Sequence, residues 1–370
     1  MKKIGKEELN IENGLKKEWL ITNGLGGYAS STIIGCNTRK YHGLLIAPFV
    51  APGRRRVILS KLDESLEIEG KKYNLYTNIA NHYISNGYTY QESFEKDYIP
   101  IFTYNVEGIE VKKLICMEYG KNTVCILYRI KNKDKKAKLT LAPVMNNRDF
   151  HQMNTNHIFS VKQKVNKQKV VLILDNQSEN PIYLNASEGN YIEHNSDMFN
   201  NMYYLEEEKR GFYPEENLVV PGRYEIEIGE NEEKEISFVC SLEDNIEELD
   251  VKKVINDEII RIRKLIISSG LYDLKLEEKY DAKYKEFIQE YIIAADNFIV
   301  FRPNFRLHTI IAGYPWFLDW ARDSLISFEG LLLIPKRYEI AKEVILTLIR
   351  DIKYGLVPNR IFRIWLKTFV

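Results

Sequence analysis

The chain has 370 residues, of which 45% are hydrophobic and 28% are charged, as is ordinary for a globular protein. This length is too great for one ordinary core and predicts two domains of roughly 100–250 residues each. The 52 basic residues balance 52 acidic ones, which argues against a nucleic-acid partner, because proteins that bind nucleic acids usually carry a basic excess.

The segment Met1 to Asn13 is charged and has no apolar stretch that resembles a secretory signal. No run of about 18 apolar residues is present, so we expect no membrane span and no membrane partner. Four scattered cysteines form no CxxC pair and are interpreted as small buried hydrophobic residues in a reducing compartment. Together these features predict a cytoplasmic protein.

Residues 43–245 carry β-strand patterns. The clearest is a hairpin, in which Ile101 to Val106 and Ile109 to Cys116 flank the turn Glu107-Gly108. About ten or more such strands with short turns predict a large antiparallel β-sandwich rather than a βαβ fold. We place this N-terminal domain at residues 1–242.

The pattern changes after residue 242, where Asn245 to Ser269 has helical spacing of its apolar residues and Gly270 provides a stop. Residues 243–272 are therefore predicted to be a linker helix. Leu276 to Val300 predicts a second helix with a broad apolar stripe.

The rest of residues 273–370 predicts the start of a helical domain. A loop is expected from Arg302 to Asp319, followed by helices over Arg322 to Ile334 and Arg337 to Tyr354.

The segment IAGYPWFLDWARDSLISFEG, residues 311–330, has the composition of a saccharide site. Sugar rings pack their C–H faces on aromatic planes, and cleavage of glycosidic bonds needs carboxylic acids. The segment combines both kinds of side chain in Trp316, Phe317, Asp319, Trp320, Arg322 and Asp323. Two alternatives remain open for Asp319, which either caps the following helix or lines one cavity with Asp323, where Arg322 would bias ionisation.

The glycine-rich segment from Glu18 to Leu45 is a weak candidate for a phosphate loop, because no GK[ST] follows it. A tight turn that approaches another domain or a ligand is the alternative. The polar run Thr38 to Gly43 either hydrogen-bonds a sugar or holds a domain interface, and the sequence does not decide between these.

Arg148 and Asp149 follow a predicted strand in the segment NNRDFH. They either line a cleft as substrate-binding residues or form a local salt-bridged turn. No HExxH motif, Cys/His cluster or GxSxG motif is present, so we predict no metal site and no serine nucleophile.

Three blocks of sequence together resemble the bacterial and archaeal glycogen-debranching family of amylo-α-1,6-glucosidase type. They are EWLITNGLGGYASSTIIGCNTRKYHGLLIA, NNRDFH and TIIAGYPWFLDWARDSLISFEGLLL. The resemblance implies an N-terminal β-sandwich followed by an (α/α)6 toroid, of which this chain holds an incomplete start. It implies inverting hydrolysis of α-1,6-linked glucose at branch points of glycogen or branched maltodextrin, with no cofactor.

The resemblance also implies roles for residues of the third block. Asp323 would be the general acid, Arg322 would orient it, and Trp316, Phe317, Asp319 and Trp320 would shape a glucose subsite. A general acid is protonated when it acts, so we expect Asp323 to be buried beside the tryptophans. Ala321 stands where the family usually has glycine, which crowds a tight turn.

Inversion requires a second carboxylate about 6.5–9.5 Å from the acid, and Asp319 is too near in sequence to serve. In the family this base lies further on, in helices that the chain does not possess. Because the tail Ile361 to Val370 departs from the family pattern, we expect a truncation or frameshift near residue 360 and apolar helix faces without partners. The alternatives to an enzyme are a non-catalytic glucan-binding or scaffold protein and an unrelated β-sandwich interaction protein, for which the three blocks would have to be coincidence.

Overall fold

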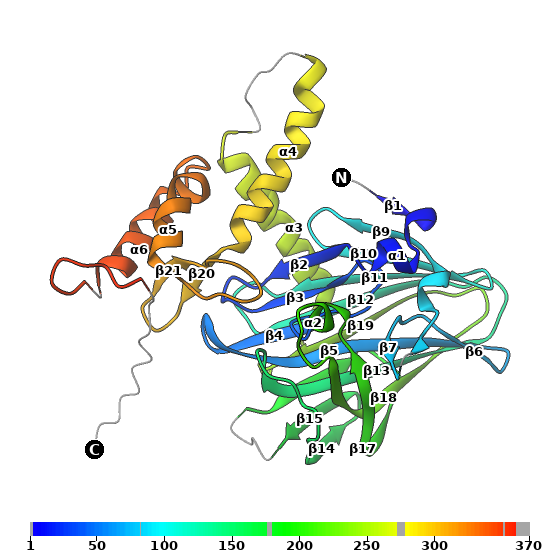
Figure 1. Ribbon diagram of the computed structural model, residues 1–370. Helices are drawn as coiled ribbons and strands as arrows, with labels where there is room; N and C mark the ends of the chain where they lie inside the picture. Colours follow the sequence, from blue (N-terminus) through cyan, green and yellow to red (C-terminus); the bar gives the residue numbers. More distant parts are fainter. Residues whose placement is uncertain (1–2, 82, 176–179, 272–277, 351, 360–370) are drawn as a thin grey trace. The chain divides into compact units, whose positions relative to one another are not determined.

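The computed structural model in Figure 1 describes residues 3–81, 83–175, 180–271, 278–350 and 352–359. The predicted tail Ile361 to Val370 and the predicted helix start at Leu276 lie outside these residues. The chain divides into two units, each described by itself below. The sandwich unit comprises Met1–Ile21, Tyr28–Ala47 and Arg56–Asn256, and the helical unit comprises Thr22–Gly27, Pro48–Arg55 and Asp257–Val370.

Two large sheets make up most of the β structure (Figure 1). The first has the strand order β1 (Ile4–Gly5), β9 (Gln91–Lys96), β10 (Pro100–Val106), β11 (Ile109–Met117), β12 (Thr123–Lys131), β19 (Glu233–Ser241), β16 (Ile182–Ala186), β15 (Lys169–Leu174) and β14 (Val161–Asn166). The second has the order β2 (Glu18–Thr22), β3 (Tyr28–Thr32), β4 (Gly43–Val50), β5 (Gly53–Ile68), β13 (Ala137–Asp149), β18 (Glu215–Ile228), β17 (Asn190–Tyr203), β7 (Ile79–Ala80) and β8 (Tyr83–Ile84), with β6 (Lys71–Asn74) paired to β5. Short helical turns accompany them as η1 (Lys6–Glu8), α1 (Ile11–Gly14), η2 (Gly87–Tyr90) and α2 (Leu205–Lys209).

The predicted hairpin is confirmed. Val106 pairs with Ile109, and the two residues between them, Glu107 and Gly108, have φ angles of 51° and 89°. Positive φ at both central residues gives a turn whose twist matches the flanking strands, which explains the Glu-Gly pair at this point.

Contacts across the interior show that the two sheets face each other. Tyr128 of β12 donates a hydrogen bond to Oε1 of Glu64 on β5 at 2.6 Å. The Trp19 ring of β2 packs edge-on against Phe102 of β10, with centroids 6.3 Å apart. The predicted large antiparallel β domain followed by helices is therefore confirmed, whereas the toroid stays a prediction.

The helical unit contains a two-stranded hairpin and several helices. Its elements are α3 (Val251–Ser268, from residue 257 onward), α4 (Glu278–Asn297), β20 (Ile299–Arg302), β21 (Leu307–Ile310), α5 (Ala321–Phe328), the π-helical turn η3 (Glu329–Leu333) and α6 (Tyr338–Ile349). A hydrophobic core shared by β20, β21, α5, η3 and α6 contains Ile299, Ile310, Ala321, Leu332, Ala341, Val344 and Leu348.

Two expectations for this region need correction. The linker helix begins at Val251 rather than Asn245, because the Asp250 side chain accepts a hydrogen bond from the Lys253 amide at 3.1 Å and so caps the helix there. The segment expected to be a loop contains strand β21, which pairs antiparallel with β20 and sets Ile299 opposite Ile310.

The outer faces of α5 and α6 carry exposed apolar side chains among the described residues. Ile326 is 78% exposed, Leu325 50% and Leu346 48%. None of the helices described is both long and apolar enough to cross a membrane.

Candidate functional site

The short hairpin β20–β21 positions the segment that precedes α5. Arg302 at the end of β20 contacts Asp319 through Nε to Oδ2 at 2.8 Å and through Nη2 to Oδ1 at 2.6 Å. Thr309 of β21 adds a hydroxyl hydrogen bond to Oδ2 at 3.1 Å. Asp319 is only 1% exposed, so its carboxylate is enclosed by these partners.

Asp319 therefore does not cap α5, contrary to one of the two alternatives. The residue in the N-cap position is Trp320, and its side chain makes no capping hydrogen bond. The amides of Ala321 and Arg322 donate instead to the backbone oxygen and the side-chain Oδ1 of Asn359, at 2.9 and 3.0 Å. Asn359 thus satisfies two of the amides that the start of a helix leaves without an intrahelical partner.

Arg322 and Asp323 lie in the first turn of α5, and both are exposed. The expectation that Asp323 is buried beside the tryptophans is therefore wrong for this structure. The exposure follows from the helix geometry, because the buried side of this turn is occupied by Ala321 and Ser324. A carboxylate in the first turn is also favoured by the N-terminal end of the helix dipole.

Aromatic side chains flank this turn. Phe317 is 49% exposed, and its ring lies edge-on to Trp320 with centroids 6.4 Å apart. Trp316 is partly buried. An exposed aromatic ring and an accessible carboxyl group in one short segment are the combination that a sugar ring needs for stacking and for proton transfer.

Arg148 and Asp149 lie on β13 and belong to a polar cluster within the sandwich unit. Arg148 is 4% exposed and contacts Glu216 through Nε and through Nη2, the latter at 2.9 Å from Oε2. Tyr204 donates to the same Glu216 oxygen at 2.6 Å. Burial disfavours the charged guanidinium, but the Glu216 carboxylate outweighs burial and raises the pKa of Arg148. The pair joins β13 to β18 across 68 residues rather than closing a local turn, and it gives Arg148 a structural role within the sheet.

Asp149 has a similar local role. Its Oδ1 accepts a hydrogen bond from the His151 amide at 2.9 Å and so closes the turn that follows β13.

The run Thr38 to Gly43 contacts the same turn within the sandwich unit. Lys40 donates through Nζ to the His151 carbonyl at 2.7 Å, and the Tyr41 hydroxyl lies 3.2 Å from His151 Nδ1. Arg39 donates through Nε to Glu18 at 2.8 Å. These contacts account for the polar run as internal structure of the sandwich unit.

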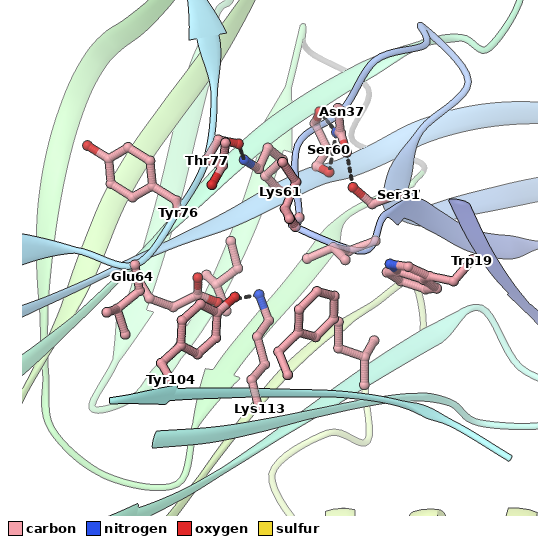
Figure 2. Close-up of a pocket in the computed structure, with 17 residues that line it drawn as sticks. Trp19, Ser31, Asn37, Ser60, Lys61, Glu64, Tyr76, Thr77, Tyr104 and Lys113 are labelled. Carbon is pink, nitrogen blue, oxygen red and sulfur yellow. Dashed lines mark hydrogen bonds and ion pairs between the residues drawn. The ribbon is translucent and has the colours of Figure 1, made fainter. Parts of the chain in front are cut away.

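Figure 2 shows a cavity between the two sheets that the sequence did not predict. Buried Lys61 donates to the Thr77 carbonyl at 2.7 Å, and buried Lys113 contacts the Glu64 carboxylate. The cavity volume is about 20 Å³. Since one water molecule requires about 10–15 Å³ on this scale, the cavity is of water size and is too small for a sugar.

The residues described in Figure 1 include no group of three or more His, Cys, Asp or Glu side chains that could hold a metal ion.

Comparison with known proteins places the chain in a family. The family described as "Glycogen debranching enzyme N terminal" matches residues 17–235, and the family described as "Amylo-alpha-1,6-glucosidase" matches residues 293–363. The chain belongs to the glycogen-debranching enzyme family. The second match contains Asp319, Arg322 and Asp323, and the first contains Arg148 and Asp149.

Several solved structures are more distantly similar. A bacterial glucoamylase complexed with acarbose is 13% identical, with a TM-score of 0.45, over 96% of this chain and 52% of that one. A putative kojibiose phosphorylase from the human microbiome is 10% identical, with a TM-score of 0.27, over 77% of this chain and 33% of that one. The chain thus spans about half of the glucoamylase and a third of the phosphorylase.

Proposed function

We propose that this chain carries the general-acid side of an inverting α-1,6-glucosidase that removes α-1,6-linked glucose from branch points of glycogen or related α-glucans. The observation that supports this most directly is the start of α5. There Asp323 is exposed in the first helical turn, and the aromatic pair Phe317 and Trp320 comes just before it in the chain. The match to amylo-α-1,6-glucosidase spans this segment.

In the proposed reaction the protonated carboxyl group of Asp323 donates its proton to the glycosidic oxygen as the C–O bond breaks. The glycosidic oxygen leaves with the glucan chain, and the oxygen of a water molecule bonds to the anomeric carbon of the glucose. Phe317 and Trp320 hold this glucose through its C–H faces. Arg322, next to Asp323 in the same turn, orients the carboxyl group.

Inversion also needs a carboxylate that activates water on the opposite face of the sugar, about 6.5–9.5 Å from the acid. Asp319 is unsuited to this role, because both of its oxygens are engaged by Arg302 in a buried pair. We therefore do not assign Asp319 as the base and propose that another carboxylate supplies it. The reaction needs no metal or cofactor in this scheme.

The experiment that tests the proposal is glucose release from a maltooligosaccharide that carries one α-1,6-linked glucose. The variant Asp323→Asn is expected to abolish release while glucan binding persists. Glu339→Gln is the matched control, because Glu339 is also an exposed acidic residue in the first turn of a helix, α6. Equal loss in both variants, or loss of binding together with activity, would argue against the acid role of Asp323.

A second candidate function is glucan binding without catalysis. The exposed ring of Phe317 supports it, because a stacking surface binds sugar whether or not a base is present. If the wild-type chain releases no glucose, this alternative is tested by comparing the affinities of Phe317→Ala and Phe287→Ala for maltoheptaose. Weaker binding by Phe317→Ala alone would support it. Phe287 is 59% exposed on α4 and provides an aromatic control within the same unit.

A further inference from the structure

Arg55 at the start of β5 is one of the largest fully buried side chains among the described residues. Its Nη1 donates to the backbone oxygens of Pro315 and Phe317, at 3.0 and 3.3 Å. Its guanidinium plane lies over the Tyr314 ring, 4.9 Å from the centroid. All four residues belong to the helical unit, although Arg55 precedes the others by about 260 positions.

Two N-terminal segments of the helical unit, Thr22–Gly27 and Pro48–Arg55, also contact the backbone of its later part. The Gly24 carbonyl accepts a hydrogen bond from the Phe301 amide at 2.8 Å. Leu318 Cδ1 lies within ordinary contact of Gly53, at 3.5 Å from the position that a Cβ would occupy. Segments 22–27 and 48–55, which include strand ends of β2, β4 and β5, therefore support the hairpin β20–β21 and the segment 314–318.

We infer that Arg55 is a positioning residue that fixes the segment Tyr314 to Phe317 and thereby the aromatic side chains Trp316 and Phe317. Its effect on glucan binding rests on the function proposed above. A planar guanidinium holds its donors in a fixed fork while its face stacks on a ring, whereas a lysine ammonium is a compact charge on a flexible stem and does not reproduce that geometry. Without the Arg55 donor, the Pro315 and Phe317 carbonyl oxygens would lose these hydrogen bonds, which would destabilise the observed path of the segment.

The test uses the full chain labelled with 5-fluorotryptophan, which places a ¹⁹F reporter on each of the four tryptophans. Trp316→Phe and Trp19→Phe assign the two resonances of interest. Arg55→Met is expected to shift the Trp316 resonance and leave that of Trp19, which is buried in the sandwich unit. Arg54→Met is the matched control, because Arg54 is the preceding residue and is exposed, and it should shift neither resonance.

Glucan binding provides the second measurement, with the Trp316 signal titrated by maltoheptaose. Arg55→Met is expected to raise the dissociation constant for maltoheptaose about tenfold. The loss of hydrogen bonds from a charged donor would displace the aromatic side chains on which the sugar stacks. The dissociation constant of Arg55→Lys should lie between those of wild type and Arg55→Met, because lysine retains the positive charge and can still donate along part of the original direction. A loss that Arg55→Lys does not partly rescue counts against positioning by hydrogen bonds.

Two results would overturn the inference. One is an unchanged Trp316 resonance in both Arg55 variants. If Arg55→Met also shifts the Trp19 resonance, that variant perturbs more than the segment, and the Trp316 resonance of Arg55→Lys is then the deciding measurement. The other is a shift of equal size in Arg54→Met. The proposed function fails separately, when wild-type protein shows no response to maltoheptaose while Arg55→Met still shifts Trp316, and that result leaves the positioning role supported.

Discussion

Arg302 and Asp319 form a two-pronged ion pair whose side chains are only 10% and 1% exposed. The pair links the end of β20 to the last turn before α5, and Thr309 of β21 completes it. Four residues later Asp323 is exposed, and no ion pair joins it to another of the described residues. Two aspartates of one short motif therefore have different roles, since Asp319 fixes the backbone and Asp323 presents its carboxyl group to solvent.

Asp319→Asn is expected to destabilise the helical unit by about 3–5 kcal/mol, because it leaves the Arg302 charge buried without its partner. Hydrogen exchange followed by mass spectrometry should show faster exchange in peptides that contain β20, β21 and α5, with peptides of the sandwich unit unchanged. Asp323→Asn should leave exchange almost unaltered, because Asp323 is exposed. Equal effects of the two variants would contradict the division of roles.

Glu216→Gln is expected to destabilise the sandwich unit by about 3–5 kcal/mol, because Glu216 is the buried carboxylate that compensates Arg148. Glu215→Gln is the control from the neighbouring position, where the carboxylate accepts one bond from the Tyr213 hydroxyl and is only partly buried. Thermal unfolding of both variants would compare them. If Glu216→Gln unfolds like wild type but loses maltoheptaose binding, the sugar-binding interpretation of Arg148 replaces the structural one.

Ionised Glu18 is expected to stabilise the folded protein, and this contribution to the free energy of unfolding should be lost in acid. Burial opposes its ionisation, but the hydrogen bonds and charges of His42 and Arg39 outweigh burial and lower the pKa of Glu18 from 4.5 to about 2. A depressed folded-state pKa means that the contribution is complete above the unfolded value of 4.5 and is lost as the pH falls towards about 2. After a discount for partial exposure, we expect about 2 kcal/mol.

The measurement is urea unfolding of wild type and Glu18→Gln across this pH range. The difference in unfolding free energy between them should shrink as the pH falls from 4.5 to about 2. Glu12→Gln is the control, because Glu12 pairs with Lys16 at the surface and is 83% exposed. If the difference in unfolding free energy between wild type and Glu18→Gln stays constant with pH, the contacts of Glu18 stabilise the fold independently of its charge.

The elements that could be predicted from sequence are those with a local signal. The hairpin at Glu107-Gly108 shows alternation on both sides of a turn, and the helices show apolar spacing. Strand β3 lacked such a signal, because Tyr28 to Thr32 is buried at every position and consists largely of small polar residues. Alternation marks a strand only when one of its faces meets water.

The candidate site was predictable in composition but not in geometry. The spacing of the motif marks Asp319 and Asp323 as neighbours, yet the partner of Asp319 lies 17 residues earlier, across the β20–β21 hairpin. Asn359 caps α5 from 37 residues downstream, and Arg55 binds the segment before it from about 260 residues upstream. These partners are chosen by tertiary packing, which no local pattern encodes.

Alanine substitutions at Gly26 and Gly108 can distinguish the destabilisation caused by close packing from that caused by backbone conformation. Their φ angles are nearly equal, at 91° and 89°. A Cβ on Gly26 would lie 2.6 Å from Cβ of Pro52 and 2.9 Å from its backbone, whereas a Cβ on Gly108 would meet nothing within 4 Å. Gly108→Ala should therefore cost only the strain of a left-handed alanine, about 1–2 kcal/mol.

Gly26→Ala should cost about 1–3 kcal/mol more, because the Pro52 turn has to move to admit the methyl group. That turn lies directly before Arg55, so Gly26→Ala should also shift the Trp316 fluorine resonance, whereas Gly108→Ala should not. Thermal unfolding and the ¹⁹F spectrum of the two variants measure both effects. Equal destabilisation would show that the loops accommodate the methyl group without cost, and an unmoved Trp316 signal in Gly26→Ala would show that the Pro52 turn and the aromatic segment move independently.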